Sequence, residues 1–167
     1  MKTTKHWSSL VGLLALLVTG CGFHLRGIND IPKWLNHVAL VMQDASRDLE
    51  PLLMDQLQAY HIDVRSDPAL AEYWLVIEHD ETRKEIVSIS STTTPRQYQL
   101  IYTVRFKLQR VKGPEMIPSS PIIVTRQVTI NSDRMLGSTS EEELLKREMR
   151  RDAAIQIIGR LSRAHDH

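Results

Sequence analysis

Side chains capable of acid–base or nucleophilic chemistry are scattered along this chain instead of being gathered in motifs. The sequence has no HExxH pair of zinc-binding histidines, no glycine-rich phosphate loop and no GxSxG nucleophile turn. His79-Asp80-Glu81 is the one stretch that suggests acid–base catalysis. On a strand, however, His79 and Glu81 share a face while Asp80 points away from them. We therefore expect no catalytic residues, no metal site and no cofactor.

The single cysteine, Cys21, follows an apolar stretch near the start of the chain. Residues 10–18 are apolar except for one glycine and come after Lys2 and Lys5. This stretch is too short to cross a bilayer, which needs about 20 apolar residues, but it fits the core of a secretory signal. Its end, Val18-Thr19-Gly20-Cys21, resembles the bacterial lipobox, in which the cysteine receives an S-diacylglycerol and an N-acyl group. The alternative is an ordinary signal peptide with a coincidental cysteine.

Acylation at Cys21 would hold the protein permanently on a membrane, because two or more acyl chains give a stable anchor. The signal peptide, residues 1–20, would be cut away. Removing Lys2 and Lys5 from 21 basic and 20 acidic residues leaves a formal net charge of −1. The next residue is Gly22, where lipoproteins kept at the inner membrane typically carry aspartate. We therefore expect export to the outer membrane.

The composition excludes several classes of protein. A chain of 167 residues, 42% of them hydrophobic and 25% charged, has the size and make-up of one folded domain. Its nearly balanced charge argues against nucleic-acid binding, and an aromatic content of 5% argues against base stacking. One cysteine excludes an intramolecular disulfide and a multi-cysteine metal site.

Five stretches predict β-strands: residues 37–43, 61–65, 74–90, 97–111 and 122–130. Residues 97–111 alternate most cleanly, with an apolar side chain at every second position from Tyr98 to Leu108. A polar interruption at residues 81–85 favours a bulge there. Polar residues 90–95 indicate a hairpin tip, and residues 112–121, with three prolines and a glycine, indicate a loop.

Arg126 departs from the pattern of the last strand, because it interrupts the apolar face of residues 122–130. Such an arginine either lies at the edge of the sheet or reaches an anion. We favour the edge.

Two helices are predicted. Asp48 is placed to cap the first, Pro51 is acceptable in its first turn, and its leucines recur at helical spacing. The second is predicted over residues 141–163, where Ser140 and Glu143 form a capping box and apolar residues recur every three or four positions.

The order of elements predicts an α+β fold. We expect a two-layer sandwich in which two helices pack on one face of a mainly antiparallel or mixed sheet of about four strands. Residues 21–36 form a lipidated tether and entry segment, and residues 37–167 form a single domain.

Three segments resemble the LPS-assembly lipoprotein family, LptE, in the same order along the mature chain. The stretch Cys21-Gly22-Phe23-His24-Leu25-Arg26-Gly27 resembles the start of its mature proteins. Residues 97–104 (QYQLIYTV) are similar to a family strand, and residues 147–154 (REMRRDAA) to the start of its closing helix.

The resemblance implies a non-enzymatic lipoprotein of the Gram-negative outer membrane. Members of the family plug the β-barrel LptD in a one-to-one complex, assist its folding and help to place lipopolysaccharide in the outer leaflet. The family fold, two helices on a four-stranded sheet, agrees with the layers expected above. The alternative is a generic outer-membrane lipoprotein that binds peptidoglycan or another envelope protein.

Lipopolysaccharide carries phosphates, and arginine is the natural partner of phosphate because its planar fork forms two parallel bonds. Arg96 follows the predicted hairpin tip, and Arg134 follows the predicted strand that ends near residue 132. If the two loops lie at the same end of the sheet, these arginines can share an anion, with neutral hydrogen bonds from Thr92, Thr93 and Thr94. The alternative is two solvated loop arginines.

Overall fold

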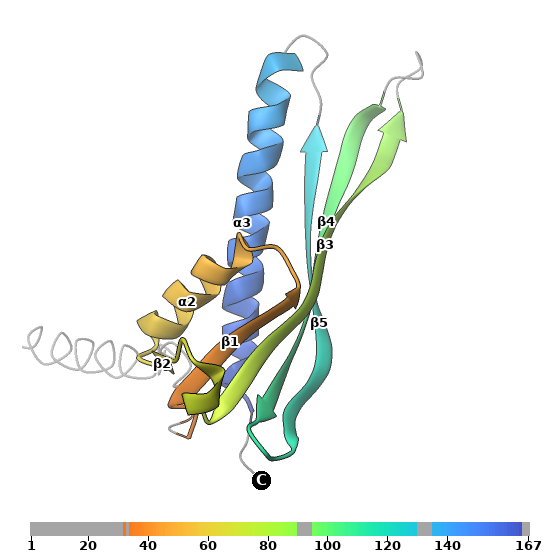
Figure 1. Ribbon diagram of the computed structural model, residues 1–167. Helices are drawn as coiled ribbons and strands as arrows, with labels where there is room; N and C mark the ends of the chain where they lie inside the picture. The colour runs from red at the N-terminus through yellow and green to blue at the C-terminus, as the bar shows by residue number, and fades with distance from the viewer. Residues whose placement is uncertain (1–31, 33, 90–94, 130–134, 165–167) are drawn as a thin grey trace, which may run out of the picture.

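The computed structural model describes residues 32, 34–89, 95–129 and 135–164 (Figure 1). They form one five-stranded sheet with the strand order β2-β1-β3-β4-β5. Its strands are β1 (His37–Asp44), β2 (Asp63–Val64), β3 (Tyr73–Ile89), β4 (Pro95–Arg110) and β5 (Glu115–Thr129). β1 runs parallel to β2 and β3, whereas β3, β4 and β5 are antiparallel neighbours.

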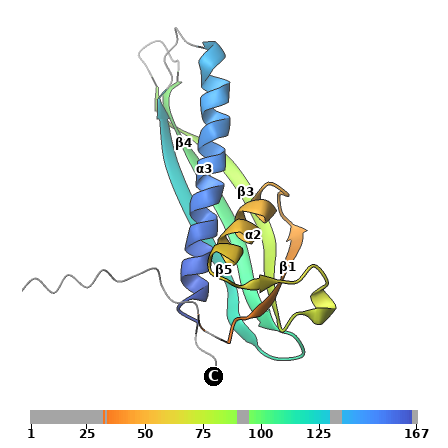
Figure 2. The same ribbon diagram turned by 90° about the vertical axis from the view of Figure 1, so that its left-hand side faces the viewer.

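Two helices, α2 (Leu49–Ala59) and α3 (Met135–Leu161), lie over one face of this sheet (Figure 2). Leu53 and Leu57 of α2 and Met149 and Ala153 of α3 are fully buried in the same core as Phe106 of β4. The predicted two-layer α+β class is therefore confirmed. The sheet has one strand more than the expected four or so. The shortest of its strands, β2, has only two residues and lies within the stretch 61–65 that was predicted as a strand. Within the described ranges, no helix combines the length and the apolar character needed to cross a membrane.

The alternation predicted for β4 is confirmed, since its even-numbered side chains from Leu100 to Leu108 are buried under the helices. The bulge predicted at residues 81–85 is in the wrong place. β3 pairs regularly with β4 there, and its irregularities lie between Ile77 and His79 and after Ile86. Between Ile77 and His79, β3 has one residue more than β4. From there on the even-numbered side chains of β3 face the helices in place of the odd-numbered ones, so that Asp80 lies on the same face as Leu75 and Ile77.

The loop predicted at residues 112–121 is largely wrong, because β5 begins at Glu115 and includes Pro118 and Pro121. β5 is the outermost strand on its side of the sheet. An outer strand leaves half of its N–H groups without a ladder partner, so proline costs no bond at those positions. The register shifts opposite Phe106 and Leu108 place bulges in the same half of β5.

α2 starts directly after Asp48, as predicted, but the start of α3 and the capping of both helices need correction. α3 begins at Met135, so Ser140 lies inside the helix and forms no capping box. Asp48 precedes α2 but does not cap it with its side chain, since its own φ and ψ of −69° and −20° are already helical. A capping side chain normally needs an extended backbone to reach the first N–H groups.

Candidate functional site at the hairpin end of the sheet

The residues proposed from the sequence to carry function fall mostly outside the described ranges. Cys21, Arg134 and Thr92, Thr93 and Thr94 are not among the described residues. Arg96 lies in β4, where its backbone but not its side chain is described. The anion site of Arg96 and Arg134 therefore stays a prediction.

The elements that flank the two candidate loops do meet at one end of the sheet (Figure 1). Ile89 and Pro95 are paired where β3 and β4 form their hairpin, and Gln97 of β4 pairs with Thr129 at the end of β5. The chain between β5 and Met135 of α3 thus starts beside the hairpin. The strand ends that lead into the two loops are therefore neighbours in the sheet.

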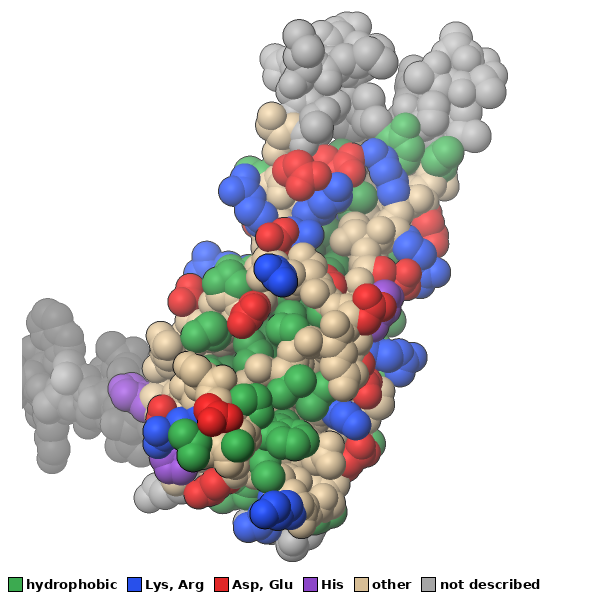
Figure 3. Space-filling model, in the orientation of Figure 1, with side chains coloured by type: hydrophobic (Ala, Val, Ile, Leu, Met, Phe, Trp, Pro, Cys, Tyr) green, Lys and Arg blue, Asp and Glu red, His purple; other side chains and the backbone are tan. Residues whose placement is uncertain are grey.

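The described lysines at this end are already held by acids of α3. Lys84 Nζ donates to Glu142 Oε2 at 2.6 Å and lies 4.4 Å from the centre of the Tyr98 ring. Lys146 Nζ lies 3.2 Å from Glu142 Oε1 and 2.8 Å from Glu143 Oε1. The hydrogen bond from Lys84 is the main cause that lowers the pKa of Glu142, and the bond to Glu143 is the main cause that raises that of Lys146. Figure 3 shows acidic and basic side chains intermixed over this part of the surface. The positive charge of these two lysines is therefore already paired within the domain.

A polar cluster that the sequence analysis missed lies deeper, under the helices. Tyr102 is 1% exposed, and its hydroxyl donates to Asp80 Oδ2 at 2.8 Å. Asp80 Oδ1 accepts from the backbone N–H of Ser46 at 2.5 Å. Burial, followed by the charge and hydrogen bond of Asp80, raises the pKa of Tyr102 far above its usual value. Tyr102 thus stays a protonated donor, and the cluster ties the β1–α2 connection to β3 and β4. A tyrosine within an apolar stripe was the available signal, since a buried hydroxyl needs a partner.

His37, His79 and Arg126 are each already paired with a carboxylate. His37 Nδ1 lies 3.1 Å from Asp63 Oδ2, and His79 Nδ1 lies 2.9 Å from Asp44 Oδ2. Arg126 lies on the outermost strand, as favoured above, and its guanidinium also pairs with the carboxylate of Asp152 on α3. No three His, Cys, Asp or Glu side chains in the described part of the chain gather as metal ligands.

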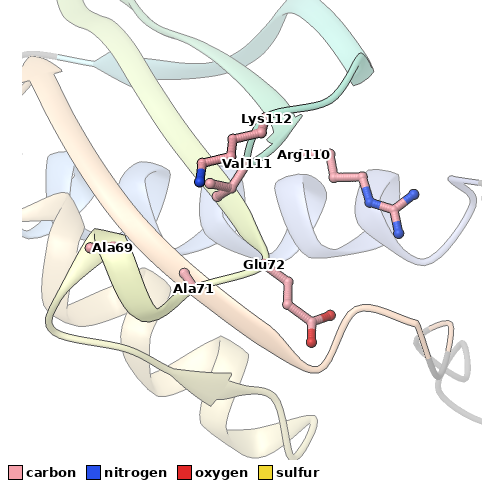
Figure 4. A pocket seen from close by; sticks show the side chains of 6 residues that line it. All are labelled: Ala69, Ala71, Glu72, Arg110, Val111 and Lys112. Atoms are coloured by element: carbon pink, nitrogen blue, oxygen red, sulfur yellow. The ribbon is translucent and has the colours of Figure 1, made fainter.

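Two shallow cavities are open to solvent. One, of about 330 Å³, lies between α2 and α3 and is lined by Asp48, Pro51, Leu52, Glu143, Arg147 and Arg150. The other, of about 280 Å³, lies at the opposite end of the sheet from the hairpin, beside the turn between β4 and β5 (Figure 4). In Figure 4 the charged ends of Glu72, Arg110 and Lys112 point apart from one another. Catalysis needs reactive groups that converge on one point, and this second cavity has none.

Comparison with protein families finds one match that spans most of the chain. The family model described as "LptE: Lipopolysaccharide-assembly" matches residues 35–161. A protein of Pectobacterium atrosepticum named LPS-assembly lipoprotein LptE is 29% identical over 154 residues, which cover 91% of this chain and 82% of that protein. A protein of Yersinia enterocolitica with the same name is 29% identical over 157 residues, covering 93% and 75% of the two chains.

Solved structures share the fold. The solution structure of lipoprotein B from Nitrosomonas europaea superimposes with a TM-score of 0.70 at 24% identity, covering 87% of this chain and 99% of that one. The crystal structure of the rare lipoprotein B from Shewanella oneidensis gives a TM-score of 0.64 at 24% identity, with coverages of 76% and 94%. At this level of identity the agreement establishes the architecture.

The buried cluster leads to a prediction about stability and its pH dependence. Changing Tyr102→Phe should lower the free energy of unfolding at pH 7 by about 1–3 kcal/mol, because the Asp80 carboxylate loses a buried donor. The deficit should shrink above about pH 10. There the tyrosine of the unfolded wild type ionises while the folded one does not, so the wild type loses stability that the variant never had. Urea unfolding at several pH values measures both effects.

Tyr98→Phe is the matched control, because Tyr98 is half-buried on the same strand and face and no described residue hydrogen-bonds its hydroxyl. This variant should unfold within about 0.5 kcal/mol of the wild type. A Tyr102→Phe deficit that stays constant or grows as the pH rises through 10 would contradict the assignment.

Proposed function

Because this chain belongs to the lipopolysaccharide-assembly family LptE, we propose that it is the lipid-anchored partner of the outer-membrane β-barrel LptD. Its role is the assembly of lipopolysaccharide at the cell envelope. The observation that carries this role is the family match over residues 35–161, which includes every described strand and helix. The role is non-enzymatic: the protein positions other molecules and makes or breaks no covalent bond.

The surface of the sheet supports a place inside a barrel. The face of β3, β4 and β5 opposite the helices carries an ion pair between Arg83 and Glu81 at 3.3 Å, together with Thr103 and the exposed Arg105. Barrel interiors are polar and wet, so a plug needs hydrogen-bonding groups on its outside. A one-to-one complex, with the small domain as a plug and an aid to folding of the barrel, fits this polar face.

The anchor we propose is Cys21, acylated on its sulfur and on its new amino group after removal of residues 1–20. The described chain begins near Pro32, 11 residues further on, and an extended chain of that length spans at most about 40 Å. The domain would therefore stay within reach of the membrane. With Gly22 after the cysteine, we place the anchor in the outer membrane.

The lipopolysaccharide contact that we propose is the anion site of Arg96 and Arg134, with hydroxyls from Thr92, Thr93 and Thr94. Two findings support it. The strand ends that flank the two loops are neighbours. Lys84 and Lys146, the described lysines at this end, already form ion pairs with Glu142 and Glu143.

The partnership predicts a stable complex. The acylated protein, extracted in mild detergent and isolated by an affinity tag, should bring down LptD in a one-to-one ratio. Size exclusion of the two co-expressed proteins should then give one peak. Recovery of muropeptides or of a soluble partner in place of the barrel would favour a generic envelope lipoprotein and contradict the proposal.

The anchor predicts that Cys21→Ala abolishes labelling by a fatty acid and leaves the protein unprocessed or soluble. Gly22→Asp is the matched control, because it keeps the acylated cysteine and changes only the residue that directs sorting. It should be labelled as the wild type is, and remain at the inner membrane. Labelling of the Cys21→Ala protein would show that another residue carries the lipid.

The anion site predicts that Arg96→Glu combined with Arg134→Glu weakens binding of lipopolysaccharide by at least about tenfold. Each charge-assisted bond is worth on the order of 1.5–3 kcal/mol when partly desolvated. Association with LptD should stay intact. The control, Lys112→Glu with Arg160→Glu, makes the same change of charge at the opposite end of the domain. Equal binding by wild type and the first double variant, with unchanged circular dichroism, would remove the site.

A further inference from the structure

The outer edge of β5 has a row of backbone groups whose direction can be derived from the hydrogen bonds of β4. The N–H of Arg110 donates to the carbonyl of Pro114, on the β5 side, whereas the N–H of Val111 donates to Glu72, on the β3 side. Both backbone groups of a strand residue point to the same side, and the side alternates along the strand. The even-numbered residues of β4 therefore bond to β5.

The register of β4 and β5 then assigns the sides of β5. Residues Leu100 and Tyr102 pair with Arg126 and Val124, so the even-numbered residues of β5 bond inward to β4. The odd-numbered residues direct their N–H and carbonyl groups outward, where none of the described strands lies. Their side chains are Ile123, Thr125 and Gln127, all exposed, with Ile123 59% exposed.

The two halves of this edge differ in their protection. Natural edge strands avoid pairing with other chains by means of proline, lysine and bulges. Residues 115–121 have bulges and two prolines, and Pro121 occupies an outward position. Residues 122–128 (IIVTRQV) have no proline or lysine and are rich in β-branched residues. Their one charge, Arg126, is neutralised by Asp152 on α3.

One outward carbonyl has a partner already. Arg126 Nη1 donates to the carbonyl of Thr125 at 3.0 Å. A carbonyl oxygen accepts two hydrogen bonds, so this contact leaves one lone pair of Thr125 available. No hydrogen bond joins the outward N–H of Ile123, Thr125 or Gln127 to another described residue.

We propose that the outer edge of β5 from Ile123 to Gln127 pairs with an extended segment of LptD and adds a sixth strand to the sheet. Outward donors and acceptors recur every second residue, about 6.8 Å apart, a spacing that another strand matches. The inference rests on the proposed function, because it assigns the surface that the barrel protein binds.

Amide hydrogen exchange at single-residue resolution tests the pairing in the full acylated protein, alone and in complex with LptD. In the isolated protein, the amides of Ile123, Thr125 and Gln127 should exchange at least tenfold faster than those of Val124 and Arg126, which bond inward. In the complex the three outward amides should slow by at least tenfold. If the one-to-one complex forms and these amides still exchange rapidly, the outer edge of β5 is not the surface that binds LptD, while the proposed partnership stands. If no complex forms, both fail.

Thr125→Pro tests the same edge by substitution, because it removes an outward N–H without removing a bond to β4. The native Pro121 occupies an equivalent outward position on this strand. Thr125→Val is the matched control, since it keeps the N–H and removes only the hydroxyl. The proline variant should bind LptD at least tenfold more weakly, and the valine variant within twofold of wild type.

Wild-type affinity for LptD in a folded Thr125→Pro protein would overturn the proposal. If that variant does not fold, the amide-exchange measurement on the wild type tests the proposal instead. Slow exchange of the outward amides in the isolated protein, together with a doubled mass, would also overturn it. A second copy of this chain would then be the occupant.

Discussion

The burial of one apolar face of β4 beneath α3 is the interaction on which the rest of this structure depends. Leu100, Val104, Phe106 and Leu108 are fully buried, and α3 lies across β4 and β5 while α2 lies beside it (Figure 2). Burying apolar side chains stabilises a domain by about 25 cal/mol for each Å² removed from water. Because both helices are needed on this face, the opposite face of the long strands is left to other contacts.

That arrangement also explains how the protein distributes its charges. The bases of the sheet that turn toward the helices meet acids of α3: Lys84 meets Glu142, and Arg126 meets Asp152. Such pairs at partly exposed positions add little stability, but they remove those bases as binding groups for other anions. Neither Lys84 nor Arg126 is therefore an unpaired cation that could recognise a phosphate. The proposed lipopolysaccharide contact draws on other residues, Arg96 and Arg134.

The bulge after Ile77 places the polar side chain of Asp80 on the face of the sheet that packs against the helices. Without the extra residue, Asp80 would lie on the open face of the sheet, and the buried Tyr102 would lose its carboxylate acceptor. With it, Asp80 turns toward Tyr102 and Ser46 and connects three separate parts of the chain. Bulges in β5 and the prolines beside them shape the other long strand, and they protect half of its free edge.

Much of the fold could be predicted from local patterns. The alternation of residues 97–111, the helical spacing of the leucines of α2 and the apolar stripe of the last helix each repeat with the period of their element. The fold class followed from the order of these elements. Local patterns failed at positions where a residue acts through a distant one. Ser140 and Glu143 have the spacing of a capping box, yet α3 continues past them to Met135, and Glu143 contacts Lys146 instead.

The sequence by itself predicts a signal segment and a lipobox at Cys21, because processing enzymes recognise a short linear stretch. It also determined the likeness to the LptE family, which resides in residues Cys21 to Arg26 and two later segments. Only the tertiary structure decided which strand is outermost, and therefore that Pro118 and Pro121 are tolerated in β5. It alone turned Asp80 inward and left the outward amides of Ile123, Thr125 and Gln127 without a partner among the described residues. Strand order, register and bulges are relations between segments far apart in the chain, and no local pattern of residue types encodes them.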